Sequence, residues 1–333
     1  MTFILLLGGI LVILGGSYFF TNGVEWLGKR LHVSEGVVGS VFAGVGTALP
    51  ETIIPIIAIF FGEGKAMQDV GVGAILGAPF MLSCLTLPLL GTGLLILAAL
   101  GRRSPQFNLN YPLVKSDLGF FLAAYSLAFM MALLPLEGSS RRTVHIIAAG
   151  LLIALYGWYL RRMLGSTETM GEDVGPLLLA RNSPLPSFLL ILIQVGLGLS
   201  VIIGGAQLFI FAVKEIATSL GVAPLILSLL ITPVATELPE KLNSLLWIYQ
   251  RKDTLAVANI TGAMVFQGTF PVAVGLIGTP WELNAYGLTS AFLALAAATL
   301  LYAQIRLRGG WLPSYVSAGA SLYLLYGLLL FLL

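Results

Sequence analysis

Two segments of the sequence, residues 46–51 (GTALPE) and 235–240 (ATELPE), carry the same pattern of polar groups. Each places a threonine four residues before a glutamate, with a proline directly before that glutamate. Because proline has no N–H, it leaves the carbonyl four residues earlier without its helical donor. Carboxylate, hydroxyl and carbonyl oxygens together form the environment that hard cations prefer, with calcium the best match for several carboxylates in flexible geometry. Softer metals would require more His or Cys than the two histidines and one cysteine of this chain.

The glutamates of these segments lie inside long apolar runs, where an ionised side chain is costly. Four ionisable residues are expected deep within such runs: Glu51, Glu237, Glu240 and Lys241. A charge at the centre of a membrane helix costs about 2.5–3.5 kcal/mol, so these groups should face an interior that supplies a cation or protons. Glu237 and Glu240 are three positions apart and share a helical face. Lys241 is turned by about 100° from Glu240, and an ion pair with a glutamate or a snorkelling side chain is as well supported as a coupling role.

The elements that position these residues must be membrane-spanning helices. Of the 333 residues, 58% are hydrophobic and only 10% are charged, whereas soluble chains carry about 25% charge. The apolar runs are longer than the strands of about 10 residues with alternating polarity that a membrane barrel needs. We therefore predict an all-α membrane protein. Ten transmembrane helices are expected, at residues 3–22, 36–62, 70–100, 118–136, 144–163, 185–213, 221–249, 254–279, 283–304 and 312–333.

The longest polar break, residues 164–184, divides the ten spans into five and five. We predict a first five-helix repeat over residues 1–163, a polar linker over 164–184 and a second five-helix repeat over 185–333. Because five is odd, the second repeat must enter the membrane from the opposite face, so the repeats are inverted. Inverted repeats place a solute site near the midplane, between broken helices, and suit alternating access. Glu51 and Glu240 would then be symmetry mates that face each other.

Basic residues are unevenly divided between the two sides of the membrane. Alternate assignment of the connections places twelve Lys and Arg on one side and four on the other, with Lys241 inside a span. The positive-inside rule makes the richer side cytoplasmic and both termini external, in the cell (inner) membrane of a prokaryote. A net charge of +2 without a basic tract argues against nucleic acid as a partner. The expected partners are inorganic cations and membrane lipid, with no covalent cofactor and no obligate protein partner implied.

The paired segments resemble the alpha-repeats of the cation/calcium exchanger superfamily, which includes the sodium/calcium exchangers. The family pattern is close to G-T-S-L-P-E, followed by G-N-x-x-G-S-N-x-x-N/D. The resemblance implies a cation antiporter in which Glu51 and Glu240 hold calcium at the centre and neighbouring oxygens hold sodium. The candidate cation-binding residues are Glu51, Glu240, Glu237, Thr47, Thr236, Asn259 and Gln267, with Glu51, Glu237 and Glu240 as metal ligands and Lys241 as a coupling or charge-compensating group.

The sequence departs from the family pattern at positions that concern ion binding. The motif serine is Ala48 in the first segment and Glu237 in the second. Residues 77–82 (GAPFML) and 262–267 (GAMVFQ) carry alanine where the family has serine, and the upstream G-N survives only before the second of them, as an alanine followed by Asn259. Sodium coordination is therefore expected to be weakened. The site is expected to be apolar around the first motif glutamate and polar around the second.

These residues predict a secondary active antiporter that exchanges a divalent cation, with calcium favoured, for sodium or protons by alternating access. Glu51 and Glu240 would be the principal ligands. Glu237 would be a third ligand or the proton carrier, because a carboxylate in a low-dielectric site favours its protonated form when no cation is bound.

Other functions stay open at this stage. An intramembrane enzyme is disfavoured, since no H-E-x-x-H, G-x-S-x-G or nucleotide motif occurs, and we predict that the chain is not an enzyme. A chain that kept the exchanger fold but lost sodium/calcium exchange could be a binding or scaffold protein. It could also carry an organic solute, for which the small side chains Ala48, Ala78 and Ala263 would enlarge a cavity and Lys241 could meet an anion.

Overall fold

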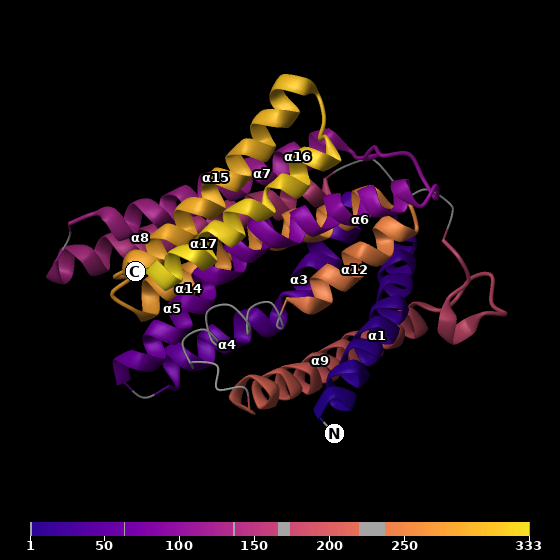
Figure 1. Ribbon diagram of the computed structural model, residues 1–333, viewed down its shortest axis with the longest axis horizontal. Coiled ribbons are helices and arrows are strands. Elements are labelled where there is room, and N and C mark those ends of the chain that lie inside the picture. Colours follow the sequence, from indigo (N-terminus) through magenta and orange to yellow (C-terminus); the bar gives the residue numbers. More distant parts are fainter. Residues whose placement is uncertain (1, 63, 136, 166–173, 220–236, 333) are drawn as a thin grey trace.

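The computed structural model describes residues 2–62, 64–135, 137–165, 174–219 and 237–332, and every regular element in these ranges is a helix (Figure 1). The elements are α1 (Thr2–Leu31), α2 (Glu35–Val37), the π-helix η1 (Val38–Ala43), α3 (Gly44–Thr47), α4 (Leu49–Phe60), α5 (Gly64–Met81), the π-helix η2 (Leu82–Thr86), α6 (Leu87–Ala99), α7 (Tyr111–Leu133), α8 (Gly138–Leu164), the 3-10 helix η3 (Leu178–Ala180), α9 (Phe188–Ser219), α12 (Leu238–Tyr249), α13 (Asp253–Gln267), α14 (Phe270–Gly278), α15 (Ala285–Arg308), α16 (Pro313–Ala318) and α17 (Ala320–Leu332). The all-α prediction is confirmed for the described ranges.

Seven stretches of the described residues are long and apolar enough to cross a membrane. They are Ile4–Leu31, Gly71–Ala99, Tyr111–Leu133, Gly138–Leu164, Phe188–Phe209, Asp253–Gly278 and Ala285–Arg308. The other three predicted spans are interrupted. Short helices make up 36–62, Gly319 separates α16 from α17 within 312–333, and part of 221–249 lies outside the described residues. Ten crossings therefore stay a prediction.

Prolines lie at or near the irregular points of two predicted spans, 36–62 and 70–100. α3 ends at Thr47, and α4 begins two residues later with Pro50 in its first turn, where a missing N–H leaves no helical bond unmade. In the long run 70–100, the π-helix η2 lies between α5 and α6, but the helical backbone continues through it from Gly71 to Ala99.

α13 lies at the centre of the bundle. Of the apolar window that includes α13, 83% is buried, whereas the other six windows are 28–61% buried. Glycines let α13 approach the first half closely. A Cβ added to Gly262 would come within 2.2 Å of Ser40 Cα, and one added to Gly44 within 2.8 Å of the Asn259 carbonyl oxygen. Small residues at such contacts allow backbones to meet, and here they bring α3 and η1 against the helix that carries Asn259.

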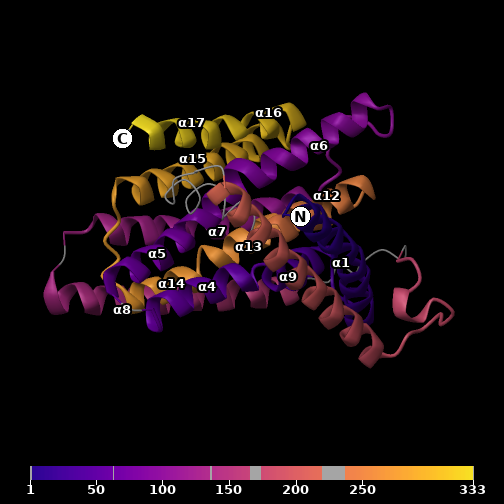
Figure 2. The ribbon, with the colours of Figure 1, turned by 60° about the horizontal axis from the view of Figure 1, so that its bottom comes forward.

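α1 and α9 form a packed pair of long helices at one edge of the bundle (Figures 1 and 2). Glycines again set the separation. A Cβ on Gly16 would lie 3.0 Å from the backbone nitrogen of Ile202, and one on Gly198 would lie 2.8 Å from Phe20 Cα. Contacts this close along both helices make the pair a single packing unit.

Residues 174–180, which we call the strap, lie across this pair. They belong to the predicted linker, whose residues 166–173 lie outside the described residues. The indole N–H of Trp26 in α1 donates to the carbonyl of Gly175 at 2.8 Å. The N–H of Leu179 donates to Gln194 Oε1 in α9 at 2.9 Å. The described part of the linker is therefore held to both helices by hydrogen bonds.

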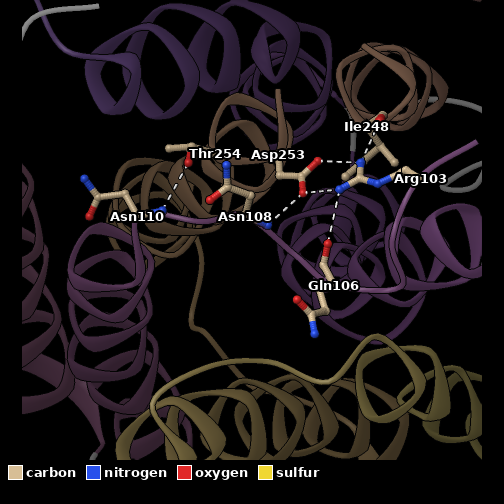
Figure 3. A network of polar contacts seen from close by, with 7 residues as sticks. All are labelled: Arg103, Gln106, Asn108, Asn110, Ile248, Asp253 and Thr254. Carbon is tan, nitrogen blue, oxygen red and sulfur yellow. Dashed lines mark hydrogen bonds and ion pairs between the residues drawn. The ribbon is translucent and has the colours of Figure 1, made fainter. Parts of the chain in front are cut away.

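A buried ion pair ties the α6–α7 connection to the start of α13 (Figure 3). Arg103 donates to Asp253 Oδ1 at 2.8 Å and to Oδ2 at 2.6 Å, and the two side chains are 8% and 0% exposed. Arg103 also donates to the carbonyls of Ile248 and Gln106, and Asp253 accepts the Asn108 N–H at 2.9 Å. Bidentate charged pairs of this kind combine strength with a fixed geometry. The network thus fixes a first-half connection against the second half.

Replacing Asp253 by asparagine is expected to lower the free energy of unfolding by about 1.5–3 kcal/mol, because Arg103 would lose the charge of its buried partner. Thermal melting of the purified protein in detergent measures the loss. The matched control is Glu282→Gln, which breaks the exposed ion pair with Arg141, and exposed pairs contribute about 0–1 kcal/mol. Equal melting temperatures for Asp253→Asn and the unmodified protein would contradict this role.

Candidate functional site

Two helix N-termini carry the central glutamates. Glu51 lies in the first turn of α4 and Glu240 in the first turn of α12. The residues that precede these helices, Ala48 and Glu237, have nearly the same backbone conformation, with φ −82° and ψ 1° against φ −87° and ψ 9°. From this site α4 and α12 run in opposite directions (Figure 1). Because a helix N-terminus carries partial positive charge, each glutamate lies where its helix stabilises a carboxylate.

Glu51 and Glu240 are buried and have no hydrogen-bond partners among the described residues. The two residues are 8% and 0% exposed, and within the described ranges none of their four carboxylate oxygens accepts a hydrogen bond. The two groups are close enough for a charge on Glu240 to act on Glu51. Since a buried ionised carboxylate without a partner is strongly unfavourable, this pair requires cations or protons to be neutralised.

Glu237 is held differently, because it forms an ion pair within its own helical turn. Lys241 Nζ lies 3.3 Å from Glu237 Oε2, and the two side chains are 3% and 1% exposed. The second oxygen, Oε1, accepts no hydrogen bond. Tyr323 of α17 is also near enough to interact with the Glu237 charge. Of the roles left open for Lys241, the structure contains the ion pair with a glutamate.

Thr47 is the threonine of the first motif and lies beside Glu240. Its hydroxyl donates to the carbonyl of Ala43 at 3.0 Å, so its proton is engaged and its remaining lone pair is available as a ligand. Its predicted counterpart, Thr236, lies outside the described residues.

The two amides predicted on α13 differ in their relation to the glutamates. Asn259 Nδ2 donates to the Glu240 carbonyl at 3.4 Å and to Ser244 Oγ at 2.9 Å, which leaves Asn259 Oδ1 without a hydrogen bond. Gln267 is buried without any side-chain partner. It lies eight residues further along α13, about 12 Å at the helical rise. The structure therefore brings Asn259 to Glu240, and a role for Gln267 stays a prediction.

The α5 side chains near the site are apolar. Pro79 and Leu82 occupy the positions of the family's asparagine and later polar residue, and both are buried. Between them, Phe80 packs on α17, with its ring centroid 5.6 Å from that of Tyr323 and 4.7 Å from that of Tyr326. No side chain of residues 77–82 contains oxygen. The described oxygen-bearing side chains of the site thus come from α3, α4, α13, α17, and α12 with the residue before it.

Within the described ranges, no three Asp, Glu, His or Cys side chains are placed so that they could hold one metal ion together. Glu237 is engaged by Lys241, so Glu51 and Glu240 are the unpaired carboxylates. With three ionised glutamates and one lysine, the site carries two net negative charges. One divalent cation or two monovalent cations would balance them. The ligand set of three carboxylates stays a prediction.

Asp117 is a buried carboxylate that the sequence analysis placed outside the spans. The predicted span began at residue 118, but α7 begins at Tyr111, where the Asn110 side chain caps the helix by accepting the Leu113 N–H at 3.1 Å. An asparagine followed two residues later by proline is a helix-start signal and was available in the sequence. Ending a span at the first charge was therefore wrong here.

Three hydroxyls stabilise Asp117 inside the bundle. Ser40 of η1 donates at 2.9 Å, Thr261 of α13 at 2.7 Å and Tyr159 of α8 at 3.1 Å. These donors satisfy a carboxylate that is 0% exposed, which explains why the helix can continue past it. Asp117 therefore joins α7, η1 and α8 to α13, the helix that carries Asn259.

Glu25 is a second correction of the same kind. The predicted first span ended at residue 22, but α1 continues to Leu31 and buries Glu25. Trp247 Nε1 donates to Glu25 at 2.8 Å, and Lys252 forms an ion pair with it. Besides the four expected residues, Asp117 and Glu25 are thus two more ionisable residues that are buried within long helices, where hydrogen bonds and an ion pair satisfy them.

Comparison with known proteins adds independent findings. A family model described as sodium/calcium exchanger protein matches residues 1–165 and 190–333. The putative antiporter CaxA of Alkalimonas amylolytica is 26% identical over 308 residues, which cover 92% of this chain and 90% of that protein. An uncharacterized membrane protein of Methanocaldococcus jannaschii is 25% identical over 320 residues, which cover 94% of this chain and 95% of that protein. The sodium-calcium exchanger NCX_Mj, soaked with zero Na⁺ and Ca²⁺, has a similar structure with a TM-score of 0.75, 19% identity and 97% coverage of both chains.

Proposed function

Because the chain belongs to the sodium/calcium exchanger protein family, we propose that it is a secondary antiporter that exchanges calcium for protons across the membrane. Members of this family are transporters and not enzymes, so the site is read as a transport site. Both the ion carried and the ion that drives it are inferences from the residues of this chain.

One observation carries the proposal: Glu51 and Glu240 are buried in the first turns of α4 and α12, and their carboxylate oxygens have no partner in the part of the chain that the structure describes. Burying two ionised carboxylates without a counter-charge is strongly unfavourable, so positive charge must enter the site. A hard divalent cation supplies two positive charges. They balance the two net negative charges of a site that consists of Glu51, Glu240, Glu237 and Lys241. The ligands are all oxygen, which favours calcium over a softer metal.

The coupling ion is inferred from what the site lacks. Sodium also prefers oxygen ligands, but the α5 segment 77–82 offers no side-chain oxygen. The motif position Ala48 offers none either. Two protons can neutralise Glu51 and Glu240 without any further ligand. Protonation of this pair and binding of one calcium ion are therefore alternative ways to balance the same charges, which is the requirement for antiport.

The architecture proposed with this function consists of two inverted five-helix repeats, residues 1–163 and 185–333, joined by residues 164–184. The matched backbone before α4 and α12 supports the repeat, and the opposite directions of these helices support the inversion. Alternating access would then open the glutamate pair to one side of the membrane at a time.

Transport in proteoliposomes tests the function. Calcium uptake is measured with a pH gradient and a sodium gradient imposed separately. Uptake is expected into vesicles with an acidic interior. Uptake driven only by sodium would retain the antiporter and reassign its coupling ion. If calcium raised the melting temperature but no gradient moved calcium, magnesium or manganese, the chain would be a binding protein with an exchanger fold and the proposal would be wrong.

A further inference from the structure

A groove of about 680 Å³ opens between α7, α8 and α15, away from the glutamate site. α7 forms its floor, with a stripe of positions spaced as one helix face: residues 111, 115, 119 and 123 together with 112, 116 and 120. Residues 155, 158 and 162 of α8 form one wall, and residues 302, 305 and 309 at the end of α15 form the other. Gly119 and Ala123 keep the floor low, because neither has a side chain larger than a methyl group.

The charges of the groove lie together at one end. Lys115 is in the second turn of α7, and Arg162 is in the last turn of α8. Lys115 Nζ lies 5.9 Å from the centre of the Tyr302 ring, a cation–π distance. Arg162 is exposed and has no ion-pair partner among the described residues. No acidic residue lines the groove. The two basic side chains at this end therefore attract an anion, and the described lining contains no acidic side chain that would repel it.

The remainder of the groove is apolar and aromatic. Phe120 and Trp158 meet edge to face, with ring centroids 5.2 Å apart, and Trp158 is 59% exposed. Exposed tryptophan beside basic residues is typical of the boundary between headgroups and hydrocarbon. The floor from residue 111 to residue 123 extends about 18 Å at the helical rise, which is close to the thickness of one leaflet of a hydrocarbon core of about 30 Å.

From this arrangement we propose that the groove binds one anionic phospholipid. Its phosphate lies between Lys115 and Arg162, and an acyl chain lies along Gly119, Ala123 and Leu155. A zwitterionic lipid would also fit the apolar part, but the cationic group of its headgroup would be repelled by Lys115 and Arg162 at the basic end. Basic pockets between transmembrane helices are known to select anionic headgroups. The basic end lies on the side that the positive-inside rule makes cytoplasmic.

Native mass spectrometry of the full chain in detergent tests the site, with dioleoyl phosphatidylglycerol and dioleoyl phosphatidylcholine as the two probes. We expect tighter binding of one phosphatidylglycerol. In the double variant Lys115→Gln and Arg162→Gln, this binding should weaken about 30-fold, since each basic residue contributes about 1 kcal/mol near an anionic headgroup. The matched control is Arg161→Gln, which removes the adjacent exposed arginine of α8 that does not line the groove.

A second variant separates the groove from the charges. Gly119→Leu keeps both cations and places a side chain in the groove, because a Cβ at this position meets only Tyr302, at 3.8 Å. We expect it to reduce binding of both lipids at this site. Equal binding of the two lipids to the unmodified protein would overturn the proposal. So would an unchanged preference in the double variant, unchanged binding in Gly119→Leu, or complete displacement of the lipid by inorganic phosphate.

Discussion

Replacing Glu240 by glutamine is expected to abolish divalent-cation transport, with a loss of more than about 100-fold, while the protein remains folded. The substitution removes a charge that has no partner in the structure, so calcium loses a ligand and the remaining site no longer balances two positive charges. Losing one charge-assisted ligand inside a dry site costs about 3 kcal/mol or more, which corresponds to this factor. Calcium uptake in proteoliposomes measures the loss, and Glu51→Gln should behave alike.

Stability separates this result from simple misfolding. Because Glu240 makes no hydrogen bond through its carboxylate, Glu240→Gln should melt at or above the temperature of the unmodified protein when calcium is absent. The rise in melting temperature on adding calcium should disappear, since a ligand stabilises only the state that binds it. Glu282→Gln, at an exposed residue, should keep both transport and the calcium-dependent rise. Transport at the normal rate in Glu240→Gln would exclude the glutamate pair as the ligand site.

Replacing Lys241 by methionine is expected to lower the free energy of unfolding by about 3–5 kcal/mol, because it leaves Glu237 buried without its counter-charge. Methionine has a similar length and keeps the packing of the lysine stem. The measurement is thermal melting in detergent, carried out above neutral pH so that the glutamate is not rescued by protonation.

The double variant Glu237→Gln and Lys241→Met supplies the matched control. It removes both charges, so most of the lost stability should return, as is common when a buried ion pair is replaced as a unit. A single variant as stable as the unmodified protein, or a double variant no more stable than the single one, would show that this ion pair contributes little. Calcium binding should survive in the double variant, because Glu51 and Glu240 remain.

The repeated motif made two helix starts predictable. Proline directly before each glutamate is favoured in the first turn of a helix, and α4 and α12 both begin at this point of the motif. The repetition also paired Ala48 with Glu237, and these residues share one backbone conformation. Local rules were sufficient because both features depend on residues within one helical turn.

Features that depend on distant partners could not be predicted in the same way. Asp117 and Glu25 were placed outside the predicted spans because each span was ended where the apolar run meets a charged residue. Their burial depends on hydroxyls and amines from other helices. Gln267 was named with Asn259 because both occupy polar positions of the family pattern, and they lie about two helical turns apart on α13. The Glu237–Lys241 pair, in contrast, joins residues four positions apart, and an ion pair of Lys241 with a glutamate was one of the roles that the sequence left open.

The strap has a mechanical consequence for the transport cycle. The strap is hydrogen-bonded to Trp26 of α1 and to Gln194 of α9. It therefore connects the two helices to each other. These helices also touch through glycines. If the proposed alternating access holds, we therefore expect α1 and α9 to move as one unit, so that one entrance closes as the other opens.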